Sequence, residues 1–139
     1  MYIKEFNVIY TEKKTDEYRL YICKKSLENQ LYRIFELADR NKIAEYIKYF
    51  NSLNFKDFYG DFSIDEKYYI VFKHPDGIIA GDSDWKKLSA KDIVKALVLQ
   101  NPPLEIAVPM LSFNNIFVYE KEIRFAYVLP MLDNRFNMV

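Results

Sequence analysis

The first part of this chain alternates apolar and polar residues, and this period of two restricts its fold more than any other feature. Successive side chains of a β-strand point to opposite faces, so alternation is typical of strands with one buried face. Residues 6–10 (FNVIY), 18–24 and 31–37 show the pattern, with the polar residues 11–17 (TEKKTDE) as the first turn. Two further strands are expected at 58–64 and 67–73, separated by Asp65 and Glu66.

The period changes to that of a helix between residues 39 and 53 (DRNKIAEYIKYFNSL). Asp39 is a suitable N-cap, because its carboxylate can accept hydrogen bonds from the first-turn amides. One apolar stripe follows at helical spacing, formed by Ile43, Tyr46, Ile47, Phe50 and Leu53. We expect an amphipathic helix packed on the sheet.

A second helix is expected at residues 89–101 (SAKDIVKALVLQN), where Ser89 and Asp92 resemble a capping box. The apolar side chains of this helix leave little polar face, so we expect it to be deeply buried. Pro102 and Pro103 end it. Residues 116–119 and 123–128 then predict a C-terminal β-hairpin. The fold class is therefore α+β, with a mostly antiparallel five-stranded sheet and one packed helix, followed by the buried helix and the hairpin. We expect a single domain over residues 1–139.

Composition excludes several classes of function. The 139 residues contain 20 basic and 20 acidic side chains, so no net charge favours nucleic acid or an anionic membrane. The N-terminus lacks a signal pattern, and no apolar run reaches the roughly 18 residues of a membrane span, so we expect a cytoplasmic protein. Cys23 is the only cysteine, which excludes an intramolecular disulfide and a zinc ligand set. Its strand-like surroundings favour an inert, buried thiol.

Two segments carry a resemblance to a known family. Asn115 and the hairpin after it (NIFVYEKEIRFAYVLP) resemble the end of a protein-kinase catalytic loop and the hairpin that leads to Asp-Phe-Gly. Residues 69–77 (YIVFKHPDG) resemble the fifth strand and the hinge of the small lobe. The chain thus resembles a degenerate, truncated protein kinase (a pseudokinase) over roughly residues 2–132. It is similar to small kinase-like proteins of low-GC bacteria, and its bias towards Lys, Ile, Asn, Tyr and Phe fits an AT-rich genome.

The same resemblance implies that the catalytic parts are missing. The first turn, residues 11–17, contains no glycine that would let the backbone fold over phosphates. Met110 stands at the position of the catalytic base, and Tyr127 replaces the metal-binding Asp. Asn115 alone cannot hold Mg²⁺, so we expect it to cap or bridge the loop. We therefore expect no enzymatic activity, no metal and no cofactor.

The alternative function is a small-molecule or nucleotide-binding module without phosphoryl transfer, which would bind its ligand in a remnant of the kinase cleft. Arg33 stands where the resemblance places a phosphate-pairing lysine, and Glu45 is either its ion-pair partner or an ordinary solvated residue. Phe72, His74 and Trp85 would lie near the mouth of this cleft. From the residues alone, His74 is better interpreted as a surface turn residue. Residues 81–85 (GDSDW) are better interpreted as a solvated loop than as a calcium site.

The aromatic residues supply the positive indication of function. Most of the 12 Tyr and 11 Phe residues fall at core positions. Six tyrosines lie off the main apolar stripes and would be exposed together if the sheet had one covered face: Tyr2, Tyr21, Tyr32, Tyr49, Tyr59 and Tyr69. An exposed aromatic patch commonly marks a partner surface. We therefore expect a non-catalytic protein–protein interaction module of a larger bacterial assembly, whose partner is another protein or a second copy of itself.

Overall fold

A division after His74 separates the chain into two units, Met1–His74 and Pro75–Val139. The structure is a computed structural model, and it describes residues 1–38, 44, 48–49, 55–76, 78–79, 89–111, 115–119 and 122–129. The expectation that residues 1–139 act as one domain stays a prediction.

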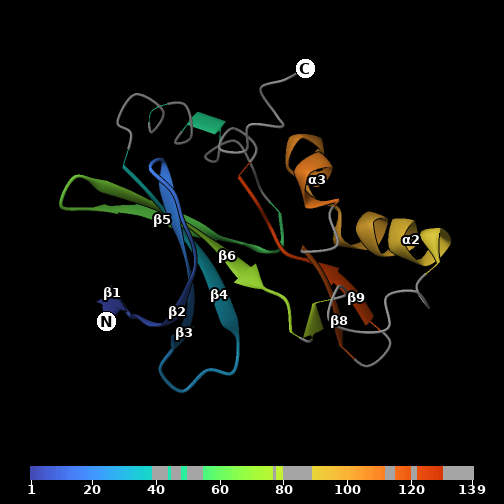
Figure 1. The fold of residues 1–139 in the computed structure, drawn as a ribbon, viewed down its shortest axis with the longest axis horizontal. Helices are drawn as coiled ribbons and strands as arrows, with labels where there is room; N and C mark the ends of the chain where they lie inside the picture. Colours follow the sequence, from blue (N-terminus) through green and yellow to red (C-terminus); the bar gives the residue numbers. More distant parts are fainter. Residues whose placement is uncertain are drawn as a thin grey trace. The chain divides into compact units, whose positions relative to one another are not determined.

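The first unit is an antiparallel sheet with the strand order β1-β2-β3-β4-β6-β5 (Figure 1). Its strands are β1 (Tyr2–Ile3), β2 (Phe6–Lys14), β3 (Tyr18–Lys25), β4 (Leu31–Leu37), β5 (Phe58–Ile64) and β6 (Lys67–His74). The sheet therefore has six strands rather than the expected five. The additional strand forms because the chain reverses at Lys4 (φ 51°) and pairs Ile3 with Phe6.

All five predicted strands of this sheet are present, and the antiparallel α+β class is confirmed. The turn between β5 and β6 is the predicted Asp65-Glu66 pair. Both residues have positive φ (48° and 72°), as a two-residue type I′ hairpin requires.

Strand β2 differs from the prediction in length and in register. It continues to Lys14, so only residues 15–17 remain as the turn. Val8 pairs with Cys23, but a bulge at the next residue makes Tyr10 pair with Ile22, which lies on the opposite face of the sheet. The expectation that Phe6, Val8 and Tyr10 share one face is therefore wrong for Tyr10, which is half exposed.

Both faces of the sheet are buried, which the alternation did not predict. We call the first the inner face, formed by Ile3, Phe6, Tyr21, Cys23, Tyr32, Ile34, Tyr69 and Val71. We call the other the second face, which includes Leu20, Ile22, Arg33, Phe35, Leu37, Tyr68, Ile70, Phe72 and His74. The prediction of exposed tyrosines is therefore wrong for Tyr21, Tyr32 and Tyr69, which are buried in the inner core, whereas Tyr2 and Tyr59 are exposed as expected.

The inner face closes because the sheet curls until its two ends meet. Tyr59 of β5 packs edge-on against Phe6 of β2, with ring centroids 5.5 Å apart. The ammonium group of Lys4 lies 4.5 Å from the ring centroid of Phe62, also on β5. A register shift between Phe58 and Gly60 accompanies the curl, and Gly60 has a φ of 154°, which side chains disfavour.

The predicted helix at 39–53 falls largely outside the described residues. Ala44, Lys48 and Tyr49 are the residues of this segment that the structure describes, and all three are helical.

The second unit contains the predicted C-terminal hairpin and two helices. Its elements are β7 (Ile78–Ile79), α2 (Ala90–Gln100), α3 (Leu104–Met110), β8 (Ile116–Tyr119) and β9 (Glu122–Phe125), with the strand order β7-β8-β9. Helix α2 begins as predicted, because the Ser89 hydroxyl accepts a hydrogen bond from the Asp92 amide at 3.1 Å. It ends at Asn101, which takes a left-handed conformation, and α3 begins directly after Pro103.

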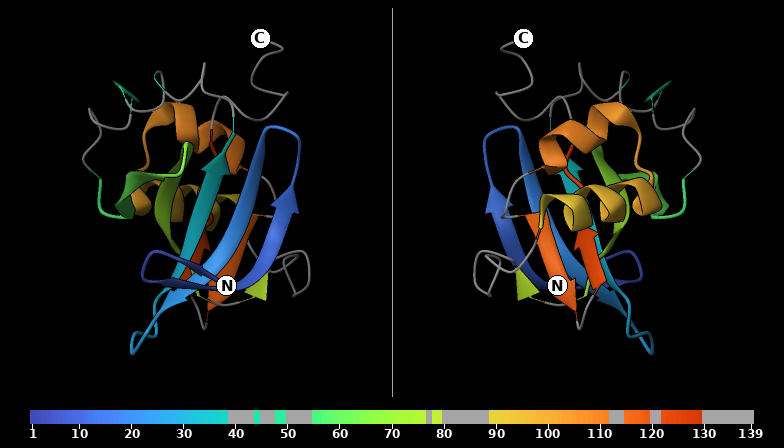
Figure 2. Two further views of the ribbon diagram at one scale, coloured as in Figure 1. Left: turned by 90° about the vertical axis from the view of Figure 1, so that its left-hand side faces the viewer. Right: turned by 90° about the vertical axis from the view of Figure 1, so that its right-hand side faces the viewer.

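Helix α2 packs against β9 along one side only (Figure 2, right). Ile93, Ala96 and Leu97 are half-buried on this side, and Gln100 is the one fully buried residue of the helix. The expectation of a deeply buried helix is therefore wrong. The opposite side exposes Val94, Val98 and Leu99, although their side chains are apolar.

Candidate functional site

Arg33 and His74, two of the residues predicted to form a binding site, are brought together on the second face. Arg33 lies on β4, and its register partner on β6 is Phe72, two residues before His74. An Arg33 guanidinium nitrogen lies 3.2 Å from Nδ1 of His74, and the other terminal nitrogen lies 3.1 Å from a carboxylate oxygen of Glu12. Sequence reasoning missed Glu12, because only the bulges of β2 turn its carboxylate towards Arg33.

Arg33 and His74 are buried in this cluster, and the Glu12 carboxylate compensates the charge of Arg33. Arg33 is 2% exposed, and burial lowers its pKa, while the Glu12 carboxylate acts in the opposite direction. Burial and then the Arg33 charge lower the pKa of His74 to about 3. Because arginine can only donate, Nδ1 of His74 must accept, so the neutral ring carries its proton on Nε2.

Such a histidine is a poor general base at neutral pH, since its proton affinity is too low and Nδ1 already accepts from Arg33. The interpretation of His74 as a surface turn residue is also wrong, because it is 4% exposed at the end of β6. Aromatic rings surround the cluster: the Arg33 guanidinium carbon lies 5.9 Å from the Phe35 ring centroid, and Phe35 packs edge-on against Phe72. The geometry favours a structural ion pair that fixes the bulged strand β2.

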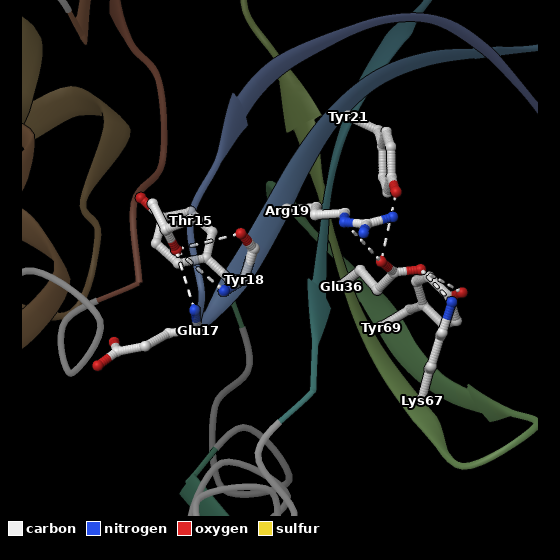
Figure 3. Close-up of polar contacts among 8 residues, drawn as sticks. All are labelled: Thr15, Glu17, Tyr18, Arg19, Tyr21, Glu36, Lys67 and Tyr69. Carbon is white, nitrogen blue, oxygen red and sulfur yellow. Dashed lines mark hydrogen bonds and ion pairs between the residues drawn. The ribbon is translucent and has the colours of Figure 1, made fainter.

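A second polar cluster lies at one edge of the inner face, centred on Glu36 of β4 (Figure 3). Its carboxylate accepts hydrogen bonds from the hydroxyl groups of Tyr69 (2.8 Å) and Tyr21 (3.3 Å). Lys67 and Arg19 approach the same carboxylate at 3.6 and 3.9 Å. Burial and then the bond to Glu36 raise the pKa of Tyr69, so this hydroxyl stays protonated and donates.

Sequence reasoning missed this cluster too, although a trace of it is visible. Glu36 and Arg33 are the two charged residues of a strand whose other residues are Leu, Tyr, Ile and Phe, and a charged residue needs partners when it is buried. Glu36 is 8% exposed, and two hydroxyl groups and two cations surround its carboxylate. The arrangement satisfies a buried charge and leaves no nucleophile or acid–base pair at this edge of the sheet.

The remaining predicted site residues are not part of either cluster. Asn115 belongs to the second unit, where its side-chain amide donates to the Pro109 carbonyl at 3.4 Å. This bond connects the end of α3 to the start of β8, which agrees with the bridging role predicted for Asn115. Glu45 and Trp85 lie outside the described residues, so their predicted roles stay predictions.

The two positions that the resemblance assigns to catalysis hold core residues. Met110 on α3 is fully buried, and Tyr127 after β9 is 1% exposed. Among the residues that the structure describes, no group of three or more His, Cys, Asp or Glu side chains is placed to hold a metal ion.

Six exposed apolar residues lie on α2, on α3 and directly after α3. We call this set the helix surface, and it consists of Val94, Val98, Leu99, Leu104, Val108 and Leu111. Their exposed fractions run from 54% for Leu111 to 76% for Leu104. A spacing of four residues places Leu104 and Val108 on one side of α3, opposite the buried Ile106 and Met110, and Leu111 follows as the C-cap.

Comparisons with known proteins found no protein-family model that matches this chain and no curated protein that is significantly similar to it. Within the described part of the chain, no helix is long and apolar enough to cross a membrane.

Proposed function

We propose that this chain is a non-catalytic, kinase-like protein–protein interaction module that docks its partner through the helix surface. The observation that carries the proposal is the exposure of six Val and Leu side chains, five on two consecutive helices and one directly after the second. A soluble monomer rarely exposes an apolar patch of more than a few hundred Å², and larger patches mark interaction sites. In this proposal the partner belongs to a bacterial assembly, and the module works in the cytoplasm.

The first turn supports a non-catalytic role. The Thr15 hydroxyl accepts hydrogen bonds from the amides of Glu17 (3.2 Å) and Tyr18 (3.1 Å), as Figure 3 shows. The Thr15 amide donates to the Tyr18 carbonyl at 2.8 Å. A loop that binds phosphate must offer free backbone amides, but these three amides already have acceptors within the hairpin.

The order of elements supports the kinase-like part of the proposal. Apart from the two-residue strand β1, three antiparallel strands precede the segment 39–53 and two more follow it, and the second unit contains the hairpin of β8 and β9. This is the order that the resemblance implies. The buried Met110 and Tyr127 support the absence of phosphoryl transfer, because neither side chain can accept a proton from a substrate or bind Mg²⁺ there.

The helix surface is a better docking site than the sheet edges. A strand edge can add a partner strand only where its backbone is regular and free. Strand β2 has two register shifts, after Val8 and after Thr11, and β5 has one after Phe58. Bulges of this kind protect edges from pairing, whereas nothing in the described chain covers Val98 or Leu99.

Affinity capture from the native host tests the proposal. The unmodified chain is compared with Val98→Glu. This substitution places a charge in the helix surface, and glutamate has a higher helix propensity than valine. Leu27→Glu is the matched control. It also replaces an exposed aliphatic side chain by a carboxylate, but at Leu27, which is fully exposed in the turn after β3. We expect a specific partner that Val98→Glu loses by tenfold or more, on the order of 1.4 kcal/mol, and Leu27→Glu retains. Equal capture by both variants would refute the helix surface as the docking site.

One observation favours the alternative, a small-molecule or nucleotide-binding module. Arg33 is a buried cation next to a neutral histidine, and an anionic ligand could replace Glu12, which is the more exposed member of the pair. Glu12 already compensates the Arg33 charge, so a ligand would have to displace it. Thermal shifts with a panel of nucleotides, with and without Mg²⁺, separate the two functions. A shift that Arg33→Gln removes would favour the alternative.

A further inference from the structure

We infer that the exposed side of α2 binds a protein segment that carries carboxylates beside its own apolar side chains. This occupant rests on the proposed function and specifies the chemistry of its partner. Three observations carry it: the order of the side chains around α2, two lysines without an ion pair, and the cost of these lysines to the helix itself.

Basic and apolar side chains are interleaved on the exposed side of α2. Successive residues of an α-helix are about 100° apart, which gives their order around the axis. From Lys91 onward, the exposed residues of α2 follow in the order Val94, Val98, Lys91, Lys95, Leu99 and Asp92. The two lysines therefore lie in the middle of the exposed side, with the valines on one flank and Leu99 on the other.

Neither lysine is neutralised by a neighbour. Within the part of the chain that the structure describes, no carboxylate lies at ion-pair distance from Lys91 or Lys95. Asp92, the acidic residue of the same helix, lies at the border of the exposed side, where its amide donates to the N-cap Ser89. Both ammonium groups are therefore available to carboxylates of a partner.

The lysines also reduce the stability of the helix that carries them. Lys91 and Lys95 stand four residues apart, and like charges at this spacing repel each other on a helix surface. Lys91 lies in the first turn, where the positive end of the helix dipole disfavours a cation. Residues that break local rules without a local gain are typical of functional surfaces. A partner with carboxylates would remove the repulsion.

The same arrangement disfavours two other occupants. A second copy of α2 would place lysines opposite lysines, and facing like charges oppose association. A helix that lies on an anionic membrane buries one continuous apolar face and keeps its lysines on the polar face. Here the lysines divide the apolar residues. A protein segment can instead set carboxylates against the lysines and apolar side chains against the valines and Leu99.

Selection from a library of short random peptides displayed on phage, with the full chain as bait, tests the inference. We expect the enriched peptides to combine Asp or Glu with apolar residues. The best peptide is then synthesised and titrated against variants of the chain. Lys91→Glu should weaken its binding at least fivefold at low salt, and the difference should shrink at high salt, because salt screens exposed charges.

Lys24→Glu is the matched control, since Lys24 is exposed on β3 and its reversal changes the net charge equally. It should leave the affinity of the peptide unchanged. Equal weakening by both variants would show that the peptide responds to net charge alone and would overturn the inference.

Melting curves separate binding from folding. Lys91→Glu places a glutamate four residues before Lys95 and a carboxylate in the first turn, and both changes favour the helix. The melting temperature should therefore not fall, although the affinity does. A melting temperature that falls together with the affinity would assign Lys91 a structural role and overturn the inference.

The remaining outcomes also decide the occupant. Enriched peptides without an excess of acidic residues, or a library that yields no peptide sensitive to Lys91→Glu, would overturn the inference. Binding to vesicles of phosphatidylcholine and phosphatidylglycerol that Lys91→Glu abolishes would assign this side of α2 to a membrane. A mass that rises with concentration and that Val98→Glu returns to one protomer would assign it to a second copy. Either result would overturn the inference.

Failure here is distinguishable from failure of the proposed function. A native partner that Val98→Glu loses and Lys91→Glu retains would refute the carboxylate-bearing segment and keep the helix surface as the docking site. A native partner that both variants retain would refute both.

Discussion

At the scale of single residues, the cost of burying Arg33 determines the chemistry of its neighbours. The guanidinium is desolvated, so it needs acceptors, and Glu12 and Nδ1 of His74 supply them within 3.1 and 3.2 Å. His74 consequently serves as an acceptor and stays neutral. Its proton uptake on unfolding links the stability of the protein to pH.

The first prediction concerns this linkage. The pKa of His74 is about 3 in the folded chain, below its usual value of 6.5. Between pH 3 and pH 6.5 the unfolded chain binds more protons than the folded chain. The free energy of unfolding therefore falls as the pH is lowered from 6.5 towards 3, and it keeps its full value above pH 6.5. His74→Asn keeps an acceptor near the Nδ1 position but does not titrate. From pH 7 to pH 5 we expect the unmodified chain to lose about 2 kcal/mol more than this variant.

Urea denaturation at the two pH values measures both free energies. The change between pH 7 and pH 5 is compared within each protein, so a constant cost of the smaller Asn side chain cancels. An equal loss in the two proteins would show that His74 titrates normally and would contradict its burial against Arg33.

At the scale of elements, the contact between α2 and β9 depends on one polar side chain. Gln100 donates to the Phe125 carbonyl at 2.8 Å and accepts from the Phe125 amide at 2.9 Å, so its side-chain amide pairs with this residue as a neighbouring strand would. Phe125 is fully buried. Few other side chains could satisfy both backbone groups, because the site requires one donor and one acceptor in the same plane.

Gln100→Leu should therefore be costly, although it adds apolar surface. The substitution removes both partners of the Phe125 backbone, and we expect a loss of about 2–4 kcal/mol in the free energy of unfolding. Lys95→Leu is the control on the same helix, because Lys95 is exposed and the change should stay within about 0.5 kcal/mol. Denaturation at low protein concentration avoids any contribution from self-association. Equal stability of the two variants would contradict the role of Gln100.

At the scale of the whole molecule, the first unit contains a complete core of its own. The inner face draws on β1, β2, β3, β4 and β6, all of which precede the division at His74. Tyr59 and Phe62 of β5 close it against Phe6 and Lys4. A core of this kind buries its apolar side chains against one another, which is the requirement for independent folding.

We expect a fragment of residues 1–76 to unfold cooperatively in urea, with less stability than the full chain. The fragment ends two residues after His74, so that its C-terminal carboxylate is kept away from Arg33. Phe6→Ala should abolish the transition, because Phe6 is fully buried in the inner face and its loss costs about 3–5 kcal/mol. Ile9→Ala is the control, since Ile9 is half exposed in the bulge of β2. A gradual, non-cooperative loss of β-structure in the unmodified fragment would contradict an independent core.

The sequence predicted local structure well and burial poorly. It identified the five main strands, the Ser89 cap and the last hairpin, because these depend on neighbouring residues. It misassigned Tyr21, Tyr32 and Tyr69, since a tyrosine opposite an apolar stripe has the same pattern whether the second face is covered or open. Arg33 and His74 lie together on the second face, but the pairing of Arg33 with Glu12 depends on bulges that no periodicity reveals.

Alternation, capping and turn residues alone determined the positions of the five main strands, of α2 and of the last hairpin, and they made an antiparallel α+β fold the expected outcome. Those preferences act over a few residues, through backbone sterics and hydrogen bonds that the chain can form locally. The curl of the sheet, the burial of its tyrosines and the exposure of α2 were decided only in the tertiary structure. They depend on which distant surfaces cover one another, and the free energy of that covering is absent from any short stretch of sequence.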